Sequence, residues 1–206
     1  MQDHFAALDL PRVPWIEAEA ARTRFLELSA AVHPDRFHNA SSEDRESATR
    51  RYADLNAAQS CLVDSKSRLL HLLELERGAR PDVVKNVPEA TMDMFMKVGQ
   101  LTREVDAFID EKDTAASPLI KAKLFQQGLE WTDRLQSLQA ELNAEMEPLN
   151  EELRALNDAW KNAPPPGSPG RIEVLPLKRL EDISRVISHL TRWSQQLQER
   201  VVRLSF

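Results

Sequence analysis

Cysteine, glycine and tyrosine are scarce in this chain of 206 residues, which contains 1 Cys, 5 Gly and 1 Tyr. The single Cys61 cannot form an intramolecular disulfide, so we expect a reducing compartment and a small core residue at this position. Aromatic residues make up only 6% of the chain. Because strands use aromatic and β-branched residues, this composition predicts almost no sheet.

Positive charge and long apolar runs are also lacking. The 27 Lys and Arg residues are outnumbered by 33 Asp and Glu residues, which gives a formal net charge of -6. Binding to nucleic acid or to an anionic membrane requires a surplus of basic residues, so we expect neither partner. No stretch reaches the length of a membrane span, and the first residues lack a basic region followed by an apolar run. These absences predict a cytoplasmic protein that binds other proteins.

The sequence contains no Gly-rich phosphate loop and no paired carboxylates with a histidine. Three possible metal ligands, His33, Asp35 and His38, lie close together, but no fourth ligand is near them in sequence. We therefore expect neither an enzyme nor a metal site, and no cofactor.

What the chain does contain is helical periodicity, with 42% hydrophobic and 29% charged residues. The pattern predicts an all-α fold. In the N-terminal part, the expected helices cover residues 5–10, 16–32, 42–62 and 68–75. Pro34 ends the second of them, because proline disfavours helical geometry in the residue before it. Gly78 closes the fourth, as glycine commonly does at a helix C-terminus.

The C-terminal part is expected to be a three-helix bundle with long helices. Those helices are predicted over residues 89–111, 118–160 and 176–204, with a Pro-rich loop at 163–170. Pro148 lies inside the second helix, where we expect a kink or a break. The predicted domains are an N-terminal helical domain at residues 1–78, a connector at 79–88 and the C-terminal three-helix bundle at 89–206.

The tripeptide His33-Pro34-Asp35 stands out because of where it lies, between two amphipathic helices of similar length. Pro34 forces the first helix to end, and the imidazole of His33 and the carboxylate of Asp35 are then presented at a stiff turn. A stiff turn loses little entropy when it binds a partner. An alternative is that Pro34 is only a helix stop and Asp35 only caps the turn.

Residues 3–78 resemble a J domain, and the order of their motifs is similar to that of the HscB family of J-domain co-chaperones. The matching blocks are Val32-His33-Pro34-Asp35-Arg36-Phe37, Leu55-Asn56-Ala57-Ala58 and Arg68-Leu69-Leu70-His71-Leu72-Leu73-Glu74-Leu75. The C-terminal part resembles the family less closely, through Met94-Phe95-Met96, Glu104-Val105-Asp106 and Gln196-Leu197-Gln198-Glu199-Arg200-Val201-Val202.

The resemblance implies two binding surfaces and two protein partners. A DnaK/HscA-class chaperone would bind His33, Pro34, Asp35, Arg36, Arg22 and Arg24. A client, the scaffold protein on which iron–sulfur clusters are built, would bind Met92, Phe95, Met96, Gly99, Gln100 and Arg103. The family alternates acidic and apolar residues in the second segment, whereas Lys97, Gly99, Gln100 and Arg103 stand here.

Two alternatives to this function remain. One is a general J protein for unfolded clients, which the non-acidic residues of the 89–111 helix would permit. The other is a coiled-coil structural or scaffolding protein that self-associates through the stripe from Leu135 to Leu156. The sequence does not decide whether the protein forms a homo-oligomer.

Overall fold

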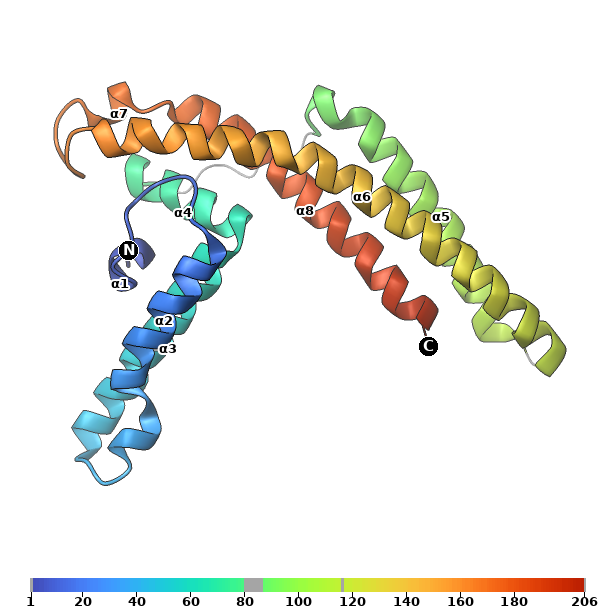
Figure 1. Ribbon diagram of the computed structural model, residues 1–206, viewed down its shortest axis with the longest axis horizontal. Coiled ribbons are helices and arrows are strands. Elements are labelled where there is room, and N and C mark those ends of the chain that lie inside the picture. The colour runs from blue at the N-terminus through green and yellow to red at the C-terminus, as the bar shows by residue number, and fades with distance from the viewer. Residues whose placement is uncertain (1, 80–86, 116, 206) are drawn as a thin grey trace. The chain divides into compact units, whose positions relative to one another are not determined.

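The structure is a computed structural model that describes residues 2–79, 87–115 and 117–205. Within these residues every regular element is a helix, which confirms the all-α fold class (Figure 1). Most of the predicted connector, residues 80–86, lies outside the described part of the chain. None of the helices in that part is both long enough and apolar enough to cross a membrane.

The chain divides into two compact units, residues 1–83 with 150–184 and residues 84–149 with 185–206. These limits differ from those of the predicted domains, because residues 150–184 pack with the N-terminal helices. The division into a J domain and a client-binding bundle therefore stays a prediction.

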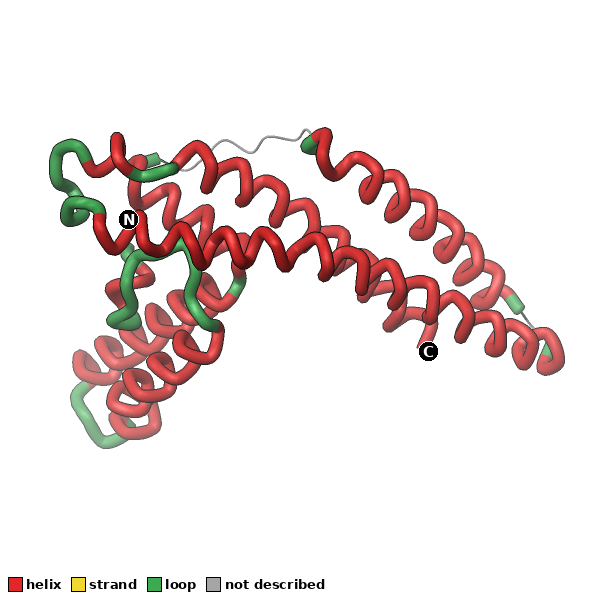
Figure 2. The backbone as a smooth tube through the Cα atoms, turned by 45° about the horizontal axis from the view of Figure 1, so that its top comes forward, coloured by secondary structure: helices red, strands yellow, loops and turns green. Residues whose placement is uncertain are grey.

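The first unit contains a helical hairpin. Its N-terminal elements are α1 (His4–Ala7), α2 (Ala18–Val32), the 3-10 helix η1 (Pro34–Phe37), α3 (Ser42–Val63) and α4 (Ser65–Arg77). Helices α2 and α3 lie side by side, and η1 is at the tip where the chain turns back (Figures 1 and 2). The Ser41 hydroxyl accepts a hydrogen bond from the Asp44 backbone N–H and caps α3. Gly78, with φ 73°, ends α4 in the left-handed conformation that favours glycine.

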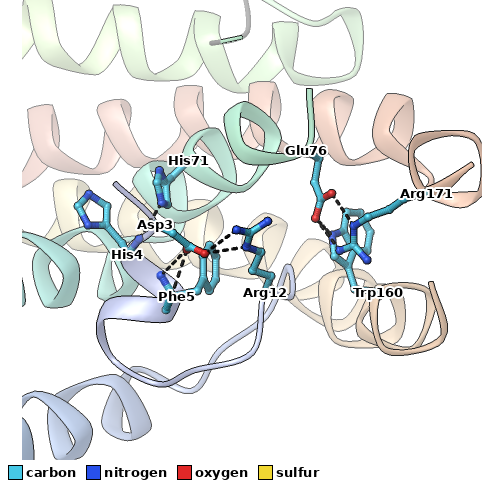
Figure 3. Close-up of polar contacts among 9 residues, drawn as sticks. Asp3, His4, Phe5, Arg12, His71, Glu76, Trp160 and Arg171 are labelled. Carbon is cyan, nitrogen blue, oxygen red and sulfur yellow. Dashed lines mark hydrogen bonds and ion pairs between the residues drawn. The ribbon is translucent and has the colours of Figure 1, made fainter. Parts of the chain in front are cut away.

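The same unit includes the end of α6 (Pro118–Asn162), α7 (Arg171–Val174) and the start of α8 (Leu177–Ser205). Two clusters join this segment to the N-terminal helices. The Asn157 side chain accepts from the Trp15 backbone N–H at 2.8 Å and donates to the Trp15 carbonyl at 2.9 Å. Glu76 on α4 forms a buried ion pair with Arg171, which the figure shows beside Trp160 (Figure 3).

The second unit is built on η2 (Glu89–Thr91), α5 (Met92–Thr114) and the remaining parts of α6 and α8. Buried side chains from all three long helices form one core: Met94, Val98, Leu101, Val105, Phe108, Ile109, Leu124, Leu135, Leu138, Leu142, Leu190, Trp193, Leu197 and Leu204. The stripe that the coiled-coil alternative requires begins with Leu135, Leu138 and Leu142. These side chains are at most 6% exposed, so they are not available for self-association.

Of the kink or break predicted at Pro148, the break is wrong, because α6 continues through this residue, and the kink stays a prediction. Proline removes the N–H that would bond to the carbonyl of Ala144. Both residues lie on the exposed side of the helix. Water can therefore solvate the freed carbonyl, which removes the main reason for the helix to end there.

Candidate functional site

The tip of the α2–α3 hairpin is organised around His33, the last residue before η1. Its backbone is extended, with φ -60° and ψ 130°, as expected for a residue before proline. Its Nδ1 accepts a hydrogen bond from the Asp35 backbone N–H at 3.3 Å and so caps η1. An imidazole that accepts at Nδ1 carries its proton on Nε2, which leaves an N–H donor for a partner.

Tyr52 on α3 holds the imidazole in place. The His33 and Tyr52 rings meet edge-on, with centroids 5.2 Å apart and an interplanar angle of 83°. The ring of Phe25 on α2 also lies near Tyr52, with the two ring centroids 6.2 Å apart. The sequence did not reveal this contact, because only the folded hairpin brings residue 52 to residue 33.

Asp35 presents its carboxylate to solvent, with 91% of the side chain exposed. His33 Nδ1 lies 3.6 Å from the Oδ2 atom of this carboxylate. His38 Nδ1 lies 2.8 Å from the Asp35 backbone carbonyl oxygen, and this contact also holds the backbone of the turn. The backbone of Asp35 is thus fixed while its carboxylate can still accept hydrogen bonds from another molecule.

The three arginines of the predicted chaperone surface are held differently. Arg36 is exposed and donates from Nη1 to the Ala30 carbonyl at 3.0 Å. Arg22 forms only an exposed pair with Glu19 at 3.3 Å. Arg24 is held most firmly, because its guanidinium pairs with both Asp9 and Glu27, at 2.8 and 2.5 Å. The hydrogen bond from Arg24 to Glu27 is the main reason why the pKa of Arg24 is raised.

The predicted client residues occupy the outer side of α5. Met92, Phe95 and Met96 are 43%, 39% and 62% exposed, so they are not bundle core. Gly99 and Arg103 continue this side at helical spacing. Gln100 lies beside them and donates to Glu104 at 2.9 Å. The six predicted residues are therefore neighbours on one helix, a surface that we call the α5 stripe.

The α5 stripe rests on a well-packed base. The Phe95 ring lies 6.1 Å from the ring of Trp193 on α8, which is only 2% exposed. Beside the stripe, Lys97 pairs with Glu141 of α6 at 2.6 Å. The basic Lys97 that interrupts the expected acidic pattern thus bridges to α6 through this pair. The sequence could not show this, because Lys97 and Glu141 are 44 positions apart.

Comparison with known proteins gives a relative for most of the chain. No family model matches the chain. Over 174 residues it is 25% identical to the co-chaperone protein HscB homolog of Mannheimia succiniciproducens, an alignment that covers 74% of this chain and 98% of that protein. The chain is related to the HscB family. The resemblance inferred from the His-Pro-Asp loop and the blocks that follow it is confirmed.

A solved structure agrees on the fold. The crystal structure of human co-chaperone protein HscB aligns with 98% of this chain and 81% of its own, with a TM-score of 0.59 and 16% identity. Chaperone HscB from Vibrio cholerae aligns with 95% of this chain and 99% of its own, with a TM-score of 0.48 and 20% identity. The human structure shows that the helices of an HscB protein follow the same course as those described above.

Proposed function

We propose that the chain is a J-domain co-chaperone of iron–sulfur cluster assembly that stimulates the ATPase of a DnaK/HscA-class chaperone and delivers a client to it. The observation that carries the proposal is the exposed Asp35 carboxylate on a fixed turn at the tip of a helical hairpin. The relationship to a protein named as an HscB co-chaperone supports the same function.

The trigger acts by binding and performs no chemistry itself. Asp35 would accept hydrogen bonds from the chaperone, and His33 would donate one from Nε2. Pro34 keeps the turn stiff, Arg36 and Arg22 attract the partner, and Arg24 contributes least because its guanidinium is already held. A partner that binds this tip better in its hydrolysis-competent state is shifted toward that state by the difference in affinity.

The substitution Asp35→Asn tests the proposal, because it removes the charge and keeps the shape of the side chain. In a single-turnover assay with the host's DnaK- or HscA-class chaperone, we expect the wild-type chain to accelerate ATP hydrolysis and Asp35→Asn to abolish the acceleration. The matched control is Asp54→Asn, which removes an exposed carboxylate from α3 and should leave the acceleration intact. Full acceleration by Asp35→Asn would contradict the proposal.

For the client, we propose that the α5 stripe binds the iron–sulfur cluster scaffold protein. Exposed methionine side chains form adaptable apolar contacts, and the stripe places two of them beside an aromatic ring. A general J protein for unfolded clients is the alternative, because the same adaptable surface would accept an extended apolar segment. The two functions share the chaperone surface and differ only in what the stripe binds.

A further inference from the structure

Leu26 on α2 is the most exposed large apolar side chain of the N-terminal helices, with 64% of its surface in contact with solvent. The other long apolar residues of the helix, Phe25 and Leu28, are half-buried. A single exposed leucine is ordinary on a protein surface. What surrounds this one makes it informative.

Leu26 lies between two guanidinium groups. Arg22 is one turn before it and Ala30 one turn after it, so all three share a side of the helix. Arg36 folds back from η1 and donates to the Ala30 carbonyl, which places a second cation on the far side of Leu26. His33 follows as the C-cap of α2, and its ring packs edge-on against Tyr52. The side of α2 that carries Arg22 and Leu26 thus leads toward the turn that bears Asp35.

The guanidinium groups of Arg22 and Arg36 can give up their present contacts for contacts with a partner. The Arg22–Glu19 pair is exposed on both sides, at 50% and 80%, and such pairs contribute little stability. Arg36 has no carboxylate within ion-pair distance among the described residues. Arg24 differs, because two carboxylates hold its guanidinium and its Nε donates to the Leu8 carbonyl at 3.3 Å.

We propose that Leu26 is an apolar anchor for the chaperone, an inference that rests on the proposed function and names the chemistry of its partner. The matching surface is an apolar patch with carboxylates at either end, one for Arg22 and one for Arg36. Salt screens the two ion pairs but not the apolar contact. Binding therefore depends strongly on Leu26 and retains most of its strength as ionic strength rises.

The test compares single-turnover ATP hydrolysis by the chaperone over a range of concentrations of the full-length chain. Leu26→Ala should raise the concentration that gives half-maximal stimulation about tenfold, the size expected for an interface anchor, and leave the maximum unchanged. Asp35→Asn should instead abolish the stimulation at every concentration. Ile172→Ala, at an exposed apolar residue of α7, is the matched control and should behave as the wild type.

Leu26→Lys separates an apolar partner surface from an acidic one. Burying a charge against an apolar patch is unfavourable, so this variant should bind no better than Leu26→Ala at low or high salt. Stronger binding than the wild type would show that the patch is acidic and overturn the anchor.

If the wild type stimulates, Asp35→Asn does not, and Leu26→Ala is indistinguishable from the wild type, the anchor is wrong and the co-chaperone function stands. If the wild type itself fails to stimulate, both are wrong. Thermal melting of each variant checks that the fold is retained, as expected for a side chain this exposed.

Discussion

Single buried residues contribute to the stability of the first unit, and His71 is one of them. His71 on α4 is only 8% exposed, and its Nε2 accepts a hydrogen bond from the His4 backbone N–H at 3.1 Å (Figure 3). The Phe5 ring stacks on its other side, and the His4 ring lies 4.5 Å away. An imidazole that accepts at Nε2 must be neutral, so this packing favours the unprotonated form.

Acid should therefore destabilise the first unit through His71. Burial first, and then the neighbouring His4, lower the pKa of His71 below its ordinary value of about 6.5. The folded state then binds fewer protons than the unfolded state, so the contribution is complete above about pH 6.5 and is lost as pH falls toward the folded pKa. Urea unfolding from pH 7.5 to 5 should show a flatter pH profile for His71→Gln than for the wild type. Parallel profiles would refute this role of His71.

The sequence predicted some of the site at this scale and missed the rest for a physical reason. His33 and Asp35 were identifiable because they belong to a local tripeptide. The ion pair between Arg24 and Asp9 could not be identified from the sequence. The Asp9 carboxylate comes near Arg24 only because of a turn in which the backbone of Asp9 has φ 51°. Side-chain exposure, which singles out Leu26, also has no local signal in the sequence.

At the scale of elements, helix periodicity predicted nearly every helix, but not what holds α4 to the segment between α6 and α8. Arg171 donates from Nε and Nη2 to the two carboxylate oxygens of Glu76, each at 2.7 Å. Trp160 Nε1 donates to the same carboxylate at 3.2 Å. Residues 95 positions apart meet here in a buried pair, and periodicity says nothing about such contacts. The short helix α7, which carries Arg171, was likewise not predicted.

Breaking this pair should be costly, because the remaining charge would stay buried. Glu76→Gln is expected to lower the free energy of unfolding by about 3 kcal/mol, measured by urea denaturation at pH 7. The control is Glu152→Gln, which breaks the more exposed Glu152–Arg179 pair of the same unit and should cost about 1 kcal/mol or less. An equal, small loss for both variants would show that the Glu76–Arg171 pair does not hold these elements together.

At the scale of the whole molecule, one chain carries the Asp35 tip in the first unit and the α5 stripe in the second. When client and trigger are on one chain, binding of the client raises the effective concentration of the trigger beside the same chaperone. We therefore expect the client to increase stimulation only if both surfaces belong to the same molecule.

A mixing experiment shows whether both surfaces must belong to one molecule. ATP hydrolysis by the chaperone is measured with the scaffold protein present, using the wild type or an equimolar mixture of Asp35→Asn with a Phe95→Ala/Met96→Ala double variant. Phe125→Ala, an exposed aromatic of α6, serves as the control for the double variant. The wild type and the control should show stimulation enhanced by the client, and the mixture should show only the level seen without the client. Equal enhancement by the mixture would contradict the account.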